Sequence, residues 1–541
     1  MKQPSSHRHS FQTVPSVKMQ RSTFRCDNSV KTTFRAGYLV PVYRQEVLPG
    51  DTINARGTVF ARLATPAFPI MDNMKMDLHF FFVPNRLIWS NWQKFCGEQT
   101  DPGDSIAYTV PQVKSPASTG YAVGSLYHHL GVAPTVPNLP HNNLYGRAYN
   151  LIYNEHYRDQ DLIDSVTVDT GDTTPGSTWD DPADYVLLKR AKYHDYFTSC
   201  RPYPQKGATS VDIGLATTAP VTRVSQAAGP LYMYQQNTDT YASATGLNTN
   251  ASGELSNSSL QKLTIDPNGS LVTDLSTAGA VTINQLRESF QIQRILERDA
   301  RAGTRYIEVV LSHFGVVSPD ARLQRPEYLG GGSTDLNLNV IAQTSGTDSE
   351  PTPLGTLGAA GTFTGFNNGF VKSFTEHGVI LGLASVRADL TYQQGLPREY
   401  SRQTRYDYYW PAFAHLGEQA VYKKELYVQD PSTDTGSTGT ADNERVFGYQ
   451  ERWAEYRQKP SEIHGFFCSQ AAADSLDAWH LAQEFASLPS LNQTFIEETP
   501  PMERIKAVTD TDWDIQADIY WRERHARVMP VRSVPGLIDH F

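Results

Sequence analysis

The chain has 541 residues, of which 39% are hydrophobic and 11% aromatic, so it can bury a large core. No stretch approaches the ~20 apolar residues of a membrane-spanning helix, and the first residues lack the apolar segment of a secretory signal, so we predict no membrane insertion. The 33 prolines and 38 glycines are spread along the chain, and long helical periodicity is absent. These features favour a β-rich protein with many loops.

The net charge of −10 is unevenly distributed. Residues 1–35 hold seven basic residues and one acid, Asp27, a balance of +6 that leaves −16 for the other 506 residues. A basic arm on an acidic body is typical of nucleic-acid-binding proteins, and a disordered, soluble tail is the alternative. The residues predicted to contact nucleic acid are Lys2, Arg8, Lys18, Arg21, Arg25, Lys31 and Arg35.

Two short strands are predicted directly after this arm. The first begins near Tyr38 and ends at residues 48–51, Leu-Pro-Gly-Asp, where proline and glycine occupy the positions that a type II turn favours. The second strand is predicted at residues 57–66.

Residues 76–83 predict a central strand of the core. Alternate positions divide the segment into two faces. One face is wholly apolar and the other begins polar and ends apolar; the faces are Met76, Leu78, Phe80, Phe82 and Asp77, His79, Phe81, Val83. We expect the first face to enter a sandwich core and the second to be covered by further protein near Phe81. Pro84 ends the strand because it has no N–H to donate.

Helices and further strands are predicted from the spacing of apolar residues. A short amphipathic helix is expected at Ile88, Trp92 and Phe95, and ends at Gly97. Further helices are expected at 283–303 and 448–460, a strand at 305–317, one extended or two paired strands at 370–392, and a half-buried strand at 513–521.

A break in composition marks residues 207–282, which are rich in Ser, Thr, Ala, Asn and Gly and carry only seven charged residues. Loops of this length are usually functional or disordered. We interpret the segment as an exposed, β-containing insertion, with a disordered linker as the alternative. Residues 343–369 and 430–444 are predicted to be surface loops.

No motif of a known catalytic or metal site is present. The glycine-rich residues 329–334 are interpreted as a flexible turn, since no lysine follows to bind a phosphate. Asp510, Asp512 and Asp514 have the opening spacing of a calcium loop, but the later glycine and glutamate are missing. The cysteines Cys26, Cys96, Cys200 and Cys468 form no CxxC pair and are predicted to be free thiols. We predict no catalytic residue, no metal site and no cofactor.

Five stretches together resemble the major capsid protein of the Microviridae, the small icosahedral phages with single-stranded DNA, and most closely its gokushovirus branch. They run in family order from residue 34 to residue 541. The stretches are FRAGYLVPVYRQEVLPGDT (34–52), RLATPAFPIMDNMKMDLHFFFVPNRLIWSNWQKFCGE (62–98), RPEYLGGGS (325–333), FGYQERWAEYRQKPSEIHG (447–465) and VPGLIDHF (534–541).

The resemblance implies an all-β core, an eight-stranded antiparallel jelly roll (a β-sandwich) with long loop insertions and a few short helices. Sixty copies would form a T=1 icosahedral shell around a circular single-stranded DNA genome. The implied organisation is a basic N-terminal arm (1–35), a first part of the jelly roll with an insertion between strands (36–206), an exposed insertion that builds a protrusion at the three-fold axes (207–282), and the remainder of the jelly roll with a C-terminal segment (283–541).

The resemblance also implies partners and a location. The partners are further copies of the chain, the single-stranded DNA genome, a small basic DNA-packaging protein, a pilot protein, a scaffolding protein and a host surface receptor that meets the insertion. The protein would be part of the virion, assembled in the cytoplasm of a bacterial host, and would not be an enzyme. The segments 46–51 and 448–457 are candidate subunit contacts, with ordinary packing as the alternative. A second hypothesis is a β-sandwich that binds carbohydrate or cleaves glycosides with two carboxylates.

Overall fold

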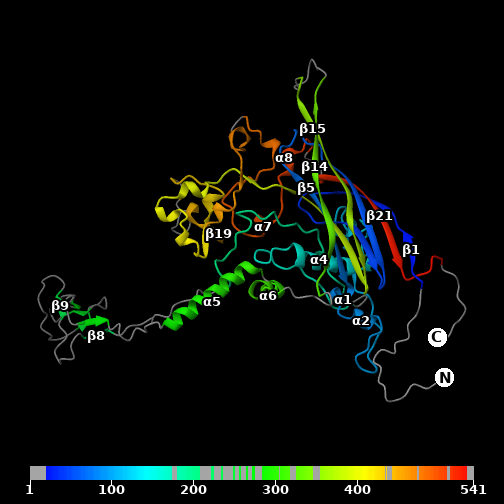
Figure 1. Ribbon diagram of the computed structural model, residues 1–541, viewed down its shortest axis with the longest axis horizontal. Helices are drawn as coiled ribbons and strands as arrows, with labels where there is room; N and C mark the ends of the chain where they lie inside the picture. Colours follow the sequence, from blue (N-terminus) through cyan, green and yellow to red (C-terminus); the bar gives the residue numbers. More distant parts are fainter. Residues whose placement is uncertain are drawn as a thin grey trace. The chain divides into compact units, whose positions relative to one another are not determined.

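The computed structural model describes residues 20–173, 179–207, 283–303, 305–316, 324–344, 354–432, 434, 442–471, 474–508 and 512–532, and the backbone of short strands between residues 221 and 273 (Figure 1). The chain divides into two compact units. The larger is Met1–Pro204 with Gly303–Phe541, and the smaller is Gln205–Ala302.

The larger unit is built on one antiparallel sheet, in the order β1-β21-β4-β15-β14-β5-β16-β3, with β2 also paired to β21. Because β1 and β2 pair with successive parts of β21, the sheet has eight strand positions. The strands are β1 (Ser22–Arg25), β2 (Asn28–Phe34), β3 (Val40–Val47), β4 (Thr52–Leu63), β5 (Met74–Pro84), β14 (Glu327–Ala342), β15 (Leu357–Ser373), β16 (Gly378–Ala388) and β21 (Ile515–Arg527). This confirms the predicted all-β core with eight antiparallel strands.

The sheet curls around the main hydrophobic core. β3 and β21 lie near opposite ends of the strand order, yet the Trp521 indole donates a hydrogen bond to the Val42 carbonyl at 3.2 Å. The ring of Tyr43 lies 5.1 Å from that of Trp521. The two ends of the sheet therefore face each other across the core, as in a jelly roll.

Strand β5 is central, as predicted, with β14 on one side and β16 on the other. Leu78 and Phe80 enter the main core, whereas Phe81 and Val83 enter a second hydrophobic cluster that includes residues of helix α4 (Leu144–Ile152). Both faces of β5 are therefore buried as the alternation predicts, the first in the main core and the second, near Phe81, in the second cluster.

Several other predictions are confirmed. Asp51 N–H donates to the Leu48 carbonyl at 3.0 Å, and Gly50 has φ of +88°, as a type II turn requires. The helix predicted at 283–303 is α5 (Ile283–Ala302), and the strand predicted at 513–521 is β21.

The predicted helix around Trp92 is instead two single turns, α1 (Asn85–Ile88) and α2 (Trp92–Phe95). Trp89, between them, has an extended backbone and a fully buried side chain. Its indole N–H donates to Asp172 at 2.5 Å. Burial of this side chain interrupts the helical periodicity.

Two further predictions of element type are wrong. Residues 305–317, expected as a strand, contain helix α6 (Tyr306–Phe314), which begins where Glu308 accepts from the Arg305 backbone and ends at Gly315 with φ of +68°. Residues 448–460, expected as a helix, begin in β19 (Val446–Glu451), which pairs with β18 (Glu418–Tyr422). In both segments the spacing of apolar residues was compatible with a helix and with a strand. The caps at the two ends of α6 and the pairing of β19 with β18 determined which element formed.

The glycine-rich residues 329–334 are part of β14 and not a flexible turn. A Cβ on Gly331 would lie 2.0 Å from the Leu78 carbonyl oxygen, so glycine permits a close approach to β5. Residues 357–369, predicted as loop, belong to β15. β15 and β16 share the segment 370–392, but β15 ends at Ser373, β16 begins at Gly378, and the two are not neighbours in the sheet. Both the single extended strand and the two paired strands are therefore wrong. Most of 430–444 lies outside the described residues.

Small elements complete the described structure. In the larger unit they include α3 (Leu126–His129), α7 (Gln493–Ile496), α8 (Met502–Ile505), β6 (Gln112–Lys114), β7 (Pro140–Asn142), β17 (Thr391–Tyr392) and β20 (Ser461–Glu462). In the smaller unit, three two-stranded pairs lie before α5, formed by β8 (Val221–Arg223) with β13 (Leu271–Thr273), β9 (Met233–Gln235) with β12 (Leu263–Ile265), and β10 (Asn248–Thr249) with β11 (Leu255–Ser256). Of the helices described, none is both long and apolar enough to cross a membrane.

Candidate nucleic-acid and assembly surfaces

The second half of the basic arm is part of the sheet. Arg25 lies on β1 and Lys31 on β2, and both strands pair with β21. Arg21 donates to the Thr52 hydroxyl at 2.7 Å, which ties it to β4. Lys2, Arg8 and Lys18 lie outside the described residues.

Three of the predicted basic residues form exposed ion pairs. They are Arg25 with Asp27 at 2.5 Å, Lys31 with Asp518 at 2.7 Å, and Arg35 with Asp512 at 2.7 Å. Burial alone would raise the pKa of Asp27, but hydrogen bonds from Arg25, the Glu523 backbone and Tyr520 outweigh it and lower this pKa. The excess positive charge near residues 20–35 is therefore smaller than the sequence count indicates.

Unpaired arginines lie beside the arm, on the outward positions of β4 and β21. Arg56 and Arg522 are directly opposite each other, and Arg524 is directly opposite Arg25. We call the exposed basic residues on the outward positions of β1, β2, β4 and β21 the basic sheet face, which comprises Arg25, Lys31, Arg56, Arg62, Arg522 and Arg524.

The basic sheet face places like charges together. Like charges directly opposite on a sheet are destabilising. The structure gives no ion pair or hydrogen bond between any described residue and the side chains of Arg56, Arg62, Arg522 or Arg524. The face therefore presents donors that a polyanion can satisfy.

Aromatic rings lie among these arginines. Phe60 and Tyr520 are each 44% exposed on outward positions of β4 and β21. The Arg62 guanidinium lies 5.5 Å above the Phe60 ring centroid. Exposed rings between cationic side chains are a surface on which unpaired bases stack without regard to sequence.

The sequence could have revealed part of this face. The strands predicted at 57–66 and 513–521 include Phe60, Arg62 and Tyr520. The second predicted strand stops at residue 521 and so leaves out Arg522 and Arg524. Extending its alternation by four residues would have placed both arginines on the outward face.

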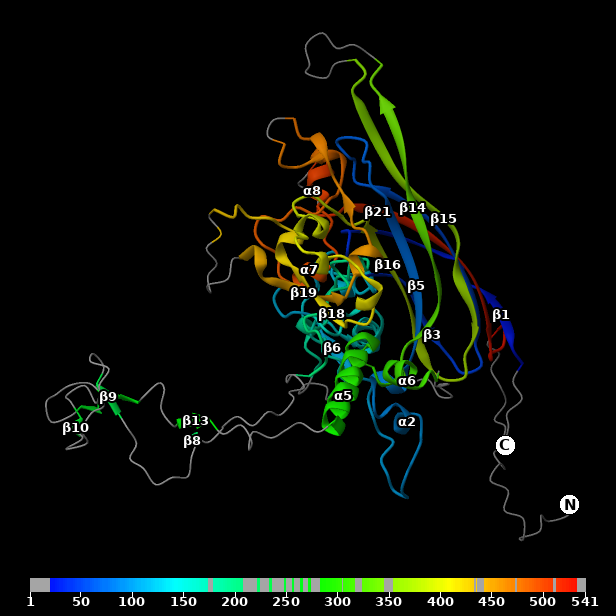
Figure 2. The same cartoon turned by 60° about the vertical axis from the view of Figure 1, so that its left-hand side comes forward.

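A second surface is the ribbon formed by the ends of β14 and β15. β14 pairs with β5 as far as Asp335, and β15 pairs with β4 only from Thr362 onward. Beyond these points the two strands pair with each other alone, from Leu338–Ala342 to Leu357–Gly361. Figures 1 and 2 show this hairpin projecting past the rest of the sheet.

The end of the ribbon is apolar and exposed. Val340 is 56% exposed, Ile341 61% and Leu354 67%. Val340 continues the face on which Leu336 and Leu338 pack against the main core. An isolated two-stranded ribbon is marginally stable in water, and exposed apolar patches mark interaction sites.

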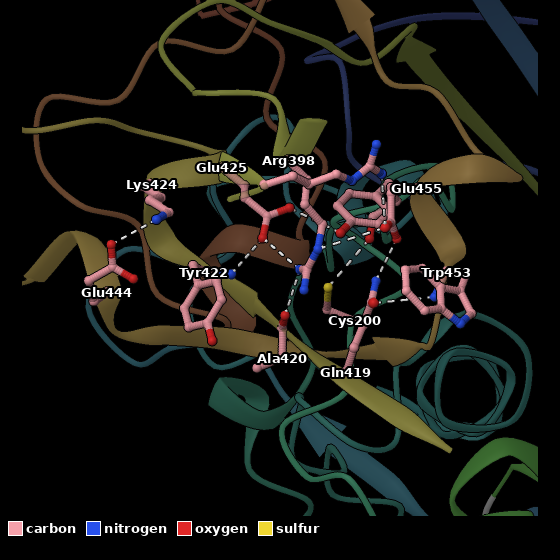
Figure 3. Close-up of polar contacts among 12 residues, drawn as sticks. Cys200, Arg398, Gln419, Ala420, Tyr422, Lys424, Glu425, Glu444, Trp453 and Glu455 are labelled. Atoms are coloured by element: carbon pink, nitrogen blue, oxygen red, sulfur yellow. Dashed lines mark hydrogen bonds and ion pairs between the residues drawn. The ribbon is translucent and has the colours of Figure 1, made fainter. Parts of the chain in front are cut away.

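The structure also contains a pair of neighbouring carboxylates that bears on the hypothesis of a glycosidase. Glu425 and Glu455 both contact Arg398, at 3.0 and 3.8 Å (Figure 3). Both carboxylates line a cavity of about 510 Å³. Burial raises the pKa of Glu425, although Arg398 opposes this.

Each oxygen of this pair already has a partner. Glu425 accepts from Arg398, from the Tyr422 backbone at 2.9 Å and from the Tyr196 hydroxyl at 3.0 Å. Glu455 accepts from Arg402 at 3.3 Å and from Gln419 at 2.7 Å (Figure 3). Two arginines balance two carboxylates, so the network links the loops that carry these residues.

Neither a disulfide nor a metal site emerges from the described structure. All four cysteines are free, and burial raises the pKa of the Cys200 thiol. Among the described residues, no group of three or more His, Cys, Asp or Glu side chains is arranged to hold a metal ion.

Comparison with known proteins decides the family. Residues 12–537 match the sequence model of a family described as capsid protein (F protein). The chain belongs to this family of phage capsid proteins. It is 46% identical to capsid protein VP1 of Bdellovibrio phage phiMH2K over 100% of both chains. It is 42% identical to VP1 of Chlamydia phage 1 over 99% of both, and 35% identical to VP1 of Spiroplasma virus 4 over 98% of this chain and 97% of that one.

The predicted resemblance to the Microviridae capsid protein is therefore confirmed. As a capsid protein, the chain is a structural component of the virion that self-assembles into a shell of many copies. This role makes the exposed surfaces informative, because a capsid subunit must contact its neighbours.

Proposed function

We propose that this capsid protein assembles as sixty copies into a T=1 icosahedral shell that encloses a circular single-stranded DNA genome, and that the shell has no enzymatic activity. The basic sheet face carries this proposal, because its opposed, exposed arginines and aromatic rings match the phosphates and unpaired bases of single-stranded DNA.

The N-terminal arm extends this surface. Lys2, Arg8, Lys18, Arg21, Arg25, Lys31 and Arg35 are proposed as DNA contacts. A charge of +6 on sixty arms gives about 360 positive charges, far fewer than the phosphates of a genome of several thousand nucleotides. We therefore expect divalent cations, polyamines or a small basic DNA-packaging protein inside the shell, in addition to the proposed pilot and scaffolding proteins.

The insertion at 207–282 is proposed to meet a surface receptor on the bacterial host, in whose cytoplasm the shell assembles. The support is its polar composition with few charged residues and its place in a separate compact unit, Gln205–Ala302. Excision of 207–282 is expected to abolish attachment to host cells and to leave assembly largely possible. Unchanged attachment would remove this role.

The apolar ribbon is proposed as a contact between neighbouring subunits. Replacement of Val340 and Ile341 by asparagine is expected to lower the yield of shells, because the exposed apolar area would no longer be buried on assembly. Because these side chains are exposed in the subunit, its free energy of unfolding is expected to change by less than ~0.5 kcal/mol.

Sedimentation and electron microscopy of particles assembled in cells test the main proposal. A megadalton particle with icosahedral symmetry and sixty subunits is expected, with nuclease-resistant single-stranded DNA inside. A stable monomer that turns over a glycoside would instead support the carbohydrate-active alternative. Deletion of residues 1–25 is expected to weaken DNA retention and to flatten its dependence on salt concentration, because fewer counterions are released when fewer phosphates are contacted.

A further inference from the structure

A small cavity lies on the face of β5 that is opposite to its main-core face. Its volume is about 360 Å³. His79 lies on β5 and Arg387 on the neighbouring strand β16. The remaining lining includes Arg190, Tyr157, Tyr193 and Tyr328. None of these residues belongs to the basic sheet face or to the network of Figure 3.

Two arginines in this cavity share a single carboxylate oxygen. Arg190 Nη1 donates to Asp77 Oδ2 at 2.6 Å, and Arg387 Nη2 donates to the same oxygen at 3.0 Å. Arg190 Nη1 also donates to the Ser385 hydroxyl at 2.9 Å. The acid therefore balances one of the two guanidinium charges.

The two guanidinium groups retain unused donors. Among the described residues, none accepts a hydrogen bond from Arg190 Nε, Arg190 Nη2 or Arg387 Nη1. Arg387 Nε is buried and also has no partner in the described part of the chain. Both arginines line the cavity, so their unused donors are available to a ligand there, although Arg387 as a whole is only 8% exposed.

Aromatic rings hold both guanidinium groups in position. Arg387 lies 3.5 Å above the centroid of Tyr193, and Arg190 lies 5.5 Å from that of Tyr157. The backbone of Arg190 is fixed on both sides, since it donates to the Gly37 carbonyl at 2.8 Å and accepts from Glu498 at 2.7 Å. Donors fixed in this way lose little entropy when a ligand binds.

The other ionisable groups leave the cavity positive. Burial, followed by the charge of Arg190, lowers the pKa of His79 to about 4, so this ring is neutral near pH 7. Burial also lowers the pKa of His156. Lys192 and His194 also line the cavity, and the buried Glu498 interacts electrostatically with Lys192.

We propose that this cavity binds a phosphate group, held by the free N–H groups of Arg190 and Arg387. Guanidinium groups recognise phosphate oxygens through paired, charge-assisted hydrogen bonds, and the ionised phosphate offsets the second positive charge. The phosphate is either free or part of a single-stranded DNA backbone, and the experiment separates these two sources.

The experiment is calorimetric titration of the full-length protein with inorganic phosphate at fixed ionic strength. Arg190→Gln and Arg387→Gln are each expected to weaken binding by about tenfold, as expected for loss of a charge-assisted hydrogen bond. Asp77→Asn is expected to tighten binding severalfold, because it removes the competing carboxylate, and misfolding could not produce that gain. Arg86→Gln is the matched control, since Arg86 is similarly buried and pairs with Glu376 at 2.8 Å outside the cavity; it is expected to leave binding unchanged.

A short thymidine oligonucleotide identifies the source. Competition between it and inorganic phosphate assigns the cavity to the DNA backbone, and absence of competition assigns it to free phosphate. The proposal is overturned if phosphate does not bind at millimolar concentration, if acetate displaces it equally well, or if the Arg190 and Arg387 variants bind like the unchanged protein. Shell formation is measured separately, so failure here leaves the proposed capsid function untouched.

Discussion

The basic sheet face and the network around Arg398 use arginine in opposite ways. In the network, Arg398 and Arg402 form ion pairs with Glu425 and Glu455, so the four side chains together carry almost no net charge (Figure 3). On the sheet face, Arg56 and Arg522 oppose each other in solvent. Burial makes an unpaired charge very costly, so buried arginines need carboxylates. Exposed like charges cost much less, so they can be kept for a partner outside the subunit.

The largest expected effect comes from breaking the buried network. Arg398→Gln leaves Glu425 buried without its cation, and we expect it to lower the free energy of unfolding by ~3–5 kcal/mol. Urea denaturation measures this loss. The double variant with Glu425→Gln should recover part of it, because the uncompensated charge is gone. A loss below ~1 kcal/mol would contradict a structural role for the network.

Glu498 sharpens the comparison, because it is a buried carboxylate with one oxygen that has no hydrogen-bond partner among the described residues. Burial raises its pKa to about 7, and the charge of Lys192 opposes the rise. The folded protein therefore binds a proton that the unfolded chain releases above pH ~4.3, so stability falls as the pH rises from there to about 7. We expect the slope of unfolding free energy against pH in this window to flatten in Glu498→Gln, and an unchanged slope would refute the assignment.

Loss of arginines from the basic sheet face is expected to raise the free energy of unfolding, whereas loss of Arg398 from the buried network lowers it. The double variant Arg56→Gln with Arg522→Gln should raise the free energy of unfolding slightly, by ~0.2–1 kcal/mol, because it removes two opposed like charges. It should also reduce the DNA retained in particles and flatten the dependence of retention on salt. Chemical denaturation and nuclease protection measure the two effects. Normal retention at every salt concentration would exclude this face as a DNA contact.

The smallest effect is expected at an exposed, paired arginine. Arg457 contacts Glu451 at 2.6 Å, and its side chain is 56% exposed. Arg457→Gln should change both stability and DNA retention little, with a change in unfolding free energy of less than ~0.5 kcal/mol. It therefore serves as the control for the Arg56 and Arg522 variant in the same assays, and a large loss of DNA would show that exposed charge anywhere on the subunit is sufficient.

Patterns of two-residue period were the most dependable guide to this fold. The two faces of 76–83 and the alternation of 513–521 identified β5 and β21. Successive side chains of a strand point to opposite faces of the sheet, whichever strands it pairs with. Alternation failed at 305–317, and helical spacing failed at 448–460, because the apolar spacing in each segment suited both a helix and a strand. There, a cap at Arg305 and a strand partner for β19 decided the outcome.

By itself, the sequence determined the class of fold, the basic arm, the absence of a recognisable catalytic motif and, through its resemblance, the capsid family. Only the tertiary structure placed Arg56 opposite Arg522 and brought Arg190 and Arg387 to the same carboxylate oxygen of Asp77. The physical reason is that periodicity records which side of an element is buried, whereas the partners of a charged side chain depend on strand pairing between distant segments. Such pairing is fixed by the packing of the whole core.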